Sequence, residues 1–96
     1  MTFDEFRASL KGTEPPRVSA PLRALWHAGR GEWAEAHAIA QDIDNINGAW
    51  VHALVHRQEG DLENARYWYR RAEQPPAIDS LDAEWQRIVS ALLTEP

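Results

Sequence analysis

The sequence predicts an all-α fold of about five helices, in which two similar antiparallel hairpins stand between a short N-terminal helix and a C-terminal helix. Apolar residues recur at helical spacing along most of the chain. Two segments match each other with an offset of 29 residues, as from Gly31 to Gly60, and glycine or proline separates successive helical stretches. Because a chain of 96 residues buries one core, we expect residues 1–96 to form a single domain.

The first helix is expected to begin at the N-terminus. Thr2 and Glu5 have the spacing of a capping box, apolar residues follow at helical spacing, and Gly12 is expected to end the helix. The prolines within residues 13–18 predict an extended connector. Ser19 is a suitable N-cap for the next helix.

The two hairpins are expected to follow from residue 20 onward. In their leading helices the matched apolar pairs are Leu22 with Val51, Leu25 with Leu54, and Trp26 with Val55. In their following helices Trp33, Ala36, Ile39, Ala40 and Ile43 match Leu62, Ala65, Trp68, Tyr69 and Ala72. The turns match as well, since each has a glycine that ends one helix and an acidic residue that opens the next. The pattern predicts two stacked helical hairpins.

A last helix is expected after the prolines at positions 75 and 76. Ser80 can cap it, and its apolar stripe contains Leu81, Trp85, Ile88 and Leu92, with Val89 beside the stripe. Repeat arrays need an atypical terminal element over their open end. We therefore expect this helix to cap the end of the stack.

The second hairpin carries a family resemblance. The run Gly60-Asp61-Leu62-Glu63-Asn64-Ala65, followed by Tyr69, Ala72 and prolines, resembles the second half of a tetratricopeptide repeat (TPR), although the period of 29 is shorter than the usual 34. The first hairpin resembles it more weakly, and together the likeness covers residues 20–76. Residues 50–72 also resemble a run shared by small uncharacterised bacterial proteins. The TPR resemblance implies a protein-interaction module.

Two histidines on one helix face are candidates for chemistry. His52 and His56 are four residues apart, Glu59 shares their face, and such a set could hold zinc or another divalent ion. The glutamate that follows the first histidine in zinc peptidases is absent, and no third ligand is evident. His27 matches His56 at the repeat offset, which favours a structural role, and His37 has no assigned role. We therefore expect no metal and no cofactor.

Three consecutive aromatic residues, Tyr67, Trp68 and Tyr69, form a second candidate. On a helix their directions spread over about 200°, so they cannot all face one core. Trp68 and Tyr69 belong to the repeated apolar pattern, which leaves Tyr67 outside it. Tyr67 is expected either to pack beneath the last helix near Trp85 or to contact a ligand or partner.

Four arginines concentrate positive charge near these residues. They are Arg57, Arg66, Arg70 and Arg71. One expectation is that they form solvated ion pairs with neighbouring acids. The other is that two of them converge near Tyr67 and the histidines and form a forked site for a carboxylate or phosphate.

Composition excludes several classes of protein. Fifteen acidic and ten basic residues give a net charge of −5, which opposes binding to nucleic acid and to anionic lipid. The chain has no cysteine, no signal-peptide pattern and no apolar stretch that could span a membrane, so we expect a cytoplasmic protein. Gly29, Gly31, Gly48 and Gly60 are expected to be isolated helix stops and not a phosphate-binding loop. Most of the five tryptophans are expected in the core.

The function expected from these observations is a non-enzymatic TPR-like interaction module, which binds a partner protein or a second copy of itself through an exposed groove. No catalytic signature is present, so an enzyme is the less favoured interpretation. The alternative is a protein, which could be an enzyme, that binds a small molecule, an anion or a metal ion. The residues expected to form either kind of site are His52, His56, Arg57, Glu59, Tyr67, Arg70 and Arg71.

Overall fold

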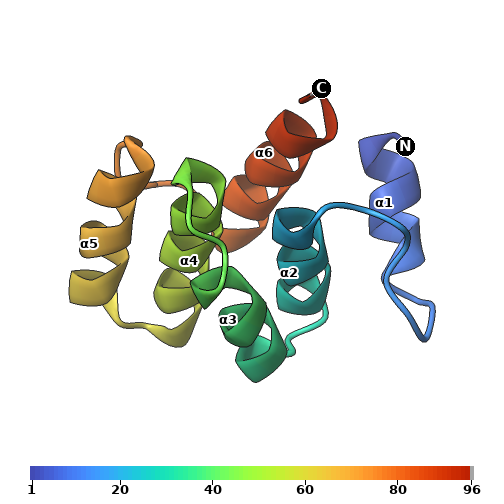
Figure 1. The fold of residues 1–96 in the computed structure, drawn as a ribbon, viewed down its shortest axis with the longest axis horizontal. Coiled ribbons are helices and arrows are strands. Elements are labelled where there is room, and N and C mark those ends of the chain that lie inside the picture. The colour runs from blue at the N-terminus through green and yellow to red at the C-terminus, as the bar shows by residue number, and fades with distance from the viewer. Residues whose placement is uncertain (96) are drawn as a thin grey trace.

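The structure, a computed structural model, describes residues 1–95, and this part of the chain contains six helices and no strand (Figure 1). The helices are α1 (Phe3–Ser9), α2 (Ala20–Gly29), α3 (Trp33–Gln41), α4 (Ile46–Glu59), α5 (Leu62–Ala72) and α6 (Leu81–Leu93). The predicted all-α class is confirmed. The expected number of about five helices is one too few, because two hairpins between two flanking helices already contain six. None of the six helices is both long and apolar enough to cross a bilayer.

Side chains cap most of the helix starts, as the sequence predicts. The capping box of α1 is complete, because the Glu5 amide donates to Thr2 at 3.1 Å and the Thr2 amide donates to Glu5 at 2.8 Å. Asp61 and Ser80 accept backbone amides at the starts of α5 and α6. Ser19 occupies the N-cap of α2, but its side chain makes no capping hydrogen bond.

The turn between α2 and α3 has the same geometry as the turn between α4 and α5. Gly31 and Gly60 both have positive φ, +76° and +90°, a conformation that favours glycine. The next residue closes each turn with a backbone hydrogen bond, Glu32 to the His27 carbonyl at 2.9 Å and Asp61 to the His56 carbonyl at 3.0 Å. The offset of 29 residues therefore appears in the backbone as well as in the apolar pattern.

Gly48 does not end a helix, contrary to expectation, but lies in the first turn of α4. Asn45 caps this helix by accepting the Gly48 amide at 3.0 Å. A Cβ at position 48 would lie only 2.3 Å from the carbonyl oxygen of Ile43. Glycine is needed here because the chain that enters α4 passes too close to the helix for any side chain.

The helices pack in consecutive pairs. Helix α2 packs on α3, α4 packs on α5, and α3 packs on α4, which joins the two pairs. Helix α6 contacts both α2 and α4, and α1 contacts α6. The C-terminal helix therefore covers the α2–α4 side of the molecule and does not cap the outer side of α5, where we expected it. Figure 1 shows α5 at one end of the molecule, beside α4.

The main core lies between α1, α2, α4 and α6, and Ala36 and Ala40 of α3 also belong to it. Trp85 joins these layers, since its indole N–H donates to the Leu25 carbonyl at 2.7 Å and its ring meets Phe3 and Phe6 edge to face. Of the five tryptophans, Trp26 and Trp85 are buried and the other three are half-buried. Most of the matched apolar positions are buried or half-buried. The exception is Leu62, the first residue of α5, which is 55% exposed.

Candidate functional site

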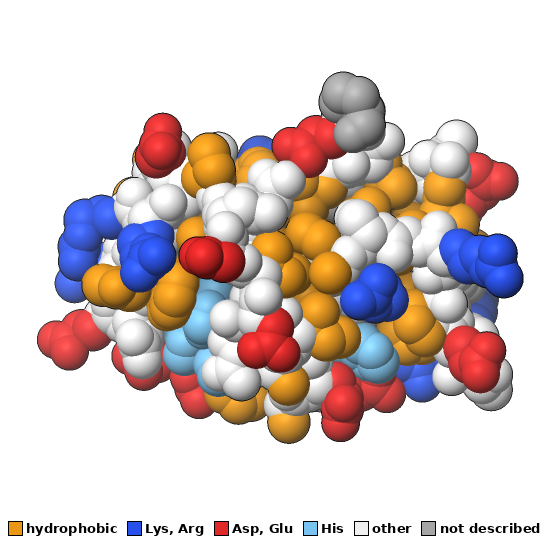
Figure 2. Space-filling view, viewed as in Figure 1, with side chains coloured by type: hydrophobic (Ala, Val, Ile, Leu, Met, Phe, Trp, Pro, Cys, Tyr) orange, Lys and Arg blue, Asp and Glu red, His pale blue; other side chains and the backbone are white. Residues whose placement is uncertain are grey.

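Three histidines from two helices meet between the two helix pairs. His37 comes from α3, and His52 and His56 come from α4. One ligand nitrogen from each ring lies within 4.8 Å of the other two, and Nε2 of His37 is 3.2 Å from Nε2 of His52. We call these three residues the histidine cluster. Figure 2 shows histidine side chains, in pale blue, reaching the surface between α5 and α3.

Each ring of the histidine cluster is held by a different neighbour. Trp33 stacks on His37, with ring centroids 4.9 Å apart, and Trp68 of α5 stacks on His52 at 3.9 Å. Glu59 accepts a hydrogen bond of 3.1 Å from Nδ1 of His56, which leaves the lone pair of that ring on Nε2. Two aromatic rings and one carboxylate therefore fix the orientation of the three imidazoles.

His52 is neutral at pH 7 in this arrangement. Its burial, and to a smaller extent the neighbouring imidazoles of His56 and His37, lowers the pKa of His52 to about 4. Burial is also the main cause that lowers the pKa of His37. Nδ1 of His52 is buried without a hydrogen-bond partner among residues 1–95, which is unusual for a polar atom in a folded protein.

Sequence reasoning found His52, His56 and Glu59 on one face but missed His37. A spacing of four residues identifies pairs within one helix, whereas His37 belongs to another helix and is 15 residues from His52. A signal was nevertheless present. His37 is four residues after Trp33 and three before Ala40, so it lies on the same helix face as these two apolar residues.

The outer surface of α5 is the second candidate. Leu62 and Tyr67 are 55% and 42% exposed, and Arg66, Arg70 and Arg71 are exposed beside them. Within residues 1–95, none of these three arginines forms an ion pair with a carboxylate. We call these five residues the α5 face. Figure 2 shows blue side chains gathered at this end of the molecule, next to orange ones.

Arg71 and Trp68 connect the α5 face to the histidine cluster. Arg71 donates to the Tyr67 hydroxyl at 3.0 Å, and its guanidinium lies 5.2 Å from the ring centroid of Trp68, which stacks on His52. Tyr67 lies next to Trp68 and does not pack beneath the last helix near Trp85. A cavity of about 330 Å³ beside this contact is lined by Arg71, Trp68 and His52, among others.

Arg57 does not belong to either candidate, contrary to expectation. It follows His56 directly, so its side chain leaves α4 about 100° away from the histidine face. There it pairs with Glu84 of α6 at 2.9 Å and donates to the carbonyl of Asp79. Arg57 is therefore not one of the arginines that could form the forked anion site expected near Tyr67 and the histidines.

Glu84 is a buried charge that the sequence analysis missed. Its carboxylate is fully buried and accepts hydrogen bonds from Arg57 and, at 2.5 Å, from the Tyr69 hydroxyl. The burial of Tyr69 and the Glu84 carboxylate together raise the pKa of Tyr69. The spacing in the sequence could have indicated its burial, because Glu84 is four residues before Ile88 and so lies on the apolar stripe of α6.

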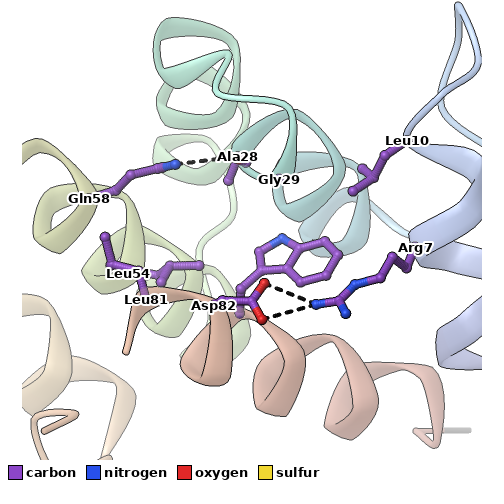
Figure 3. Close-up of a pocket in the computed structure, with 9 residues that line it drawn as sticks. Arg7, Leu10, Ala28, Gly29, Leu54, Gln58, Leu81 and Asp82 are labelled. Carbon is purple, nitrogen blue, oxygen red and sulfur yellow. Dashed lines mark hydrogen bonds and ion pairs between the residues drawn. The ribbon is translucent and has the colours of Figure 1, made fainter. Parts of the chain in front are cut away.

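A cavity of about 430 Å³ lies where α1, α2, α4 and α6 meet (Figure 3). Two pairs of polar groups are bonded at its rim, since Arg7 donates to Asp82 at 2.9 Å and the Gln58 amide nitrogen donates to the Ala28 carbonyl at 3.0 Å. Oε1 of Gln58 is buried and has no hydrogen-bond partner in the described part of the chain. None of the residues predicted to form a site lines this cavity.

Comparison with known proteins gives no assignment. No protein-family model, no curated protein and no solved structure matches the chain. Its function therefore has to be inferred from the chemistry of its own residues.

Proposed function

We propose that this chain is a non-enzymatic, TPR-like interaction module that binds an acidic segment of a partner protein on the α5 face. The observation that carries the proposal is that Arg66, Arg70 and Arg71 are exposed on one helix with no acidic partner within residues 1–95, in a protein of net charge −5. Isolated surface arginines usually pair with nearby carboxylates. These three arginines do not form such pairs, so they are available to a partner protein that supplies the carboxylates.

The packing of the helices supports an end-on site. In stacked hairpins a partner is usually received by the concave surface that the hairpins present together. Here α6 lies across α2 and α4, so that side is already covered by the chain itself. The outer surface of α5 is the open end of the two-hairpin stack and is the surface left for a partner.

The residue types of the α5 face support a protein partner. Tyrosine and arginine are enriched among residues that dominate binding energy, because both offer large contact area with polar ends. Arg71 is held in place by the Tyr67 hydroxyl and by the rings of Tyr67 and Trp68. A guanidinium fixed in this way can bind a carboxylate through two parallel hydrogen bonds with little loss of side-chain entropy.

The test is a selection of random peptides displayed on phage against the immobilised protein. We expect the selected peptides to be rich in Asp and Glu, and their binding to weaken as salt concentration rises. In the variant Arg66→Glu/Arg70→Glu/Arg71→Glu the affinity of a selected peptide should fall more than about tenfold, which corresponds to about 1.4 kcal/mol.

A matched variant controls for net charge. Lys11→Glu/Arg17→Glu/Arg23→Glu makes the same change in total charge at residues far from α5 along the chain, and it should bind the peptides as the wild type does. Peptides without acidic residues, or equal loss of binding in both triple variants, would contradict the proposal. If light scattering shows a dimer that only the α5 variant disrupts, the acidic partner is a second copy of this chain.

A further inference from the structure

We propose that His37, His52 and His56 bind a zinc ion that ties the two helical hairpins together. His37 belongs to the first hairpin, and His52 and His56 belong to the second. All three rings offer a ligand nitrogen within one region 4.8 Å across. This inference does not depend on the partner proposed for the α5 face.

The spacing of the nitrogens suits a tetrahedral site. With zinc–nitrogen bonds of 2.0–2.1 Å, ligand nitrogens in a tetrahedron are about 3.3–3.4 Å apart. Nε2 of His37 and Nε2 of His52 are 3.2 Å apart. The nitrogen of the third ring, that of His56, lies within 4.8 Å of the other two and has to move inward to reach the same spacing.

One of the three rings, that of His56, has the second hydrogen bond that is typical of metal-binding histidines. A zinc-bound imidazole usually donates its second N–H to a carboxylate or carbonyl group, which fixes the other nitrogen as the ligand. Glu59 has this relation to His56, through a hydrogen bond of 3.1 Å. Stacking on Trp33 and Trp68 restrains the rings of His37 and His52. Each of the three rings is therefore restrained by a neighbour before any ion arrives.

The burial of the cluster argues against a purely structural role. His52 and His56 are only 4% and 7% exposed. Apolar side chains would fill this contact between helices at lower cost, because each neutral imidazole brings a lone pair and an N–H that need partners. Only one hydrogen bond, between His37 and His52, joins the three rings to one another. A bound metal ion would accept the lone pairs of all three.

The donor set selects the class of metal. Imidazole nitrogen favours zinc and its neighbours copper, nickel and cobalt, whereas magnesium and calcium prefer sites made of oxygen atoms. The chain has no cysteine, so thiolate ligands do not compete. Three histidines leave a fourth position for water.

The experiment is titration of the whole, chelator-treated protein with Co²⁺ and Zn²⁺. We expect one Co²⁺ per chain with the intense visible absorption of tetrahedral cobalt, and displacement of that cobalt by zinc. Zinc at about 100 times its dissociation constant should raise the melting temperature by roughly 10–20 °C. Weak octahedral absorption together with an unchanged melting temperature would overturn the proposal.

The chain provides a matched set of variants. His37→Phe can keep the stacking on Trp33 and should weaken zinc binding more than about 100-fold, beyond the 10–100-fold loss expected when Glu59→Gln removes a residue that only orients a ligand. His27→Ala removes the fourth histidine of the chain, which bonds Glu32 outside the cluster, and should bind zinc normally. If His37→Phe is folded by circular dichroism and binds zinc like the wild type, the proposed site is wrong.

Discussion

The Tyr69 hydroxyl donates a hydrogen bond of 2.5 Å to the carboxylate of Glu84, and this contact fastens α5 to α6 within the buried interior. Arg57 from α4 completes the contact by pairing with the same carboxylate. Three helices that follow different paths are therefore held by one charged group. Because Glu84 is fully buried, each of its partners satisfies a charge that water cannot reach.

Removing the charge of Glu84 should destabilise the fold strongly. Glu84→Gln leaves Arg57 without its ion pair, and breaking a buried pair typically costs about 3–5 kcal/mol. We expect the melting temperature to fall by more than about 10 °C. Asp82→Asn, on the same helix, breaks an ion pair with Arg7 in which the two side chains are 74% and 45% exposed, and should cost less than about 1 kcal/mol. Thermal unfolding of both variants checks the comparison, and equal losses would contradict it.

Tyr69 should remain protonated in alkaline solution. Burial and the neighbouring Glu84 carboxylate raise its pKa above the usual value of 10. At pH 10, where an ordinary tyrosine is half ionised, we expect Tyr69 to be mostly neutral. The variant Tyr67→Phe leaves Tyr69 as the one tyrosine, so its ultraviolet titration reports this group alone. The same variant in denaturant should be half ionised near pH 10, and identical folded and unfolded titrations would refute the expectation.

The raised pKa of Tyr69 also makes the stability of the fold depend on pH in the alkaline range. The unfolded chain loses its Tyr69 proton near pH 10, whereas the folded chain keeps it to higher pH because the pKa of Tyr69 is raised. The stabilisation from the protonated hydroxyl is therefore complete below pH 10 and is lost as the pH rises above 10. In Tyr69→Phe, the melting temperature should fall less steeply between pH 10 and 11 than in the wild type.

The sequence predicted the helices well because their signals are local. The capping box at Thr2 and Glu5 and the glycines at 31 and 60 act through neighbours a few residues away, and the structure has them as expected. The same holds for most apolar positions of the two hairpins. Gly48 was misread because its reason is a close approach of the preceding chain, which composition does not reveal.

The candidate sites were only partly predictable because they join helices distant along the chain. Spacing within α4 placed His52 and His56 together, but it could not show that His37 of α3 meets them. Nor could it show that α6 packs on α2 and α4, or that Arg57 of α4 pairs with Glu84 of α6. These contacts depend on how helices pack, and a single sequence contains no direct measure of that.

The substitutions Gly60→Ala and Gly48→Ala should lower the free energy of unfolding by different amounts, because the two glycines are needed for different reasons. Gly60 has φ +90°, and a Cβ at this position would have no atom within 4 Å, so Gly60→Ala should cost only the backbone strain, about 1–2 kcal/mol. In Gly48→Ala the new methyl would lie 2.3 Å from the Ile43 carbonyl oxygen. The chain before α4 would have to move, and we expect a loss of about 3 kcal/mol or more. Urea unfolding gives both values, and an equal or reversed order would contradict the interpretation.

Substitutions of Tyr67 and Tyr69 should have separate effects, the first on peptide binding and the second on the stability of the fold. Tyr67 is 42% exposed and contacts Arg71 and Trp68, whereas Tyr69 is 3% exposed and bonded to Glu84. Tyr67→Ala should change the free energy of unfolding by less than about 1 kcal/mol. It should lower the affinity for the acidic peptides that bind the α5 face by about tenfold or more. Tyr69→Ala should cost about 3–5 kcal/mol, because it creates a cavity and leaves one oxygen of the buried Glu84 carboxylate without its donor. Peptide binding and thermal unfolding, measured on both variants, decide whether Tyr67 serves recognition. Full peptide affinity in Tyr67→Ala would remove it from the proposed site.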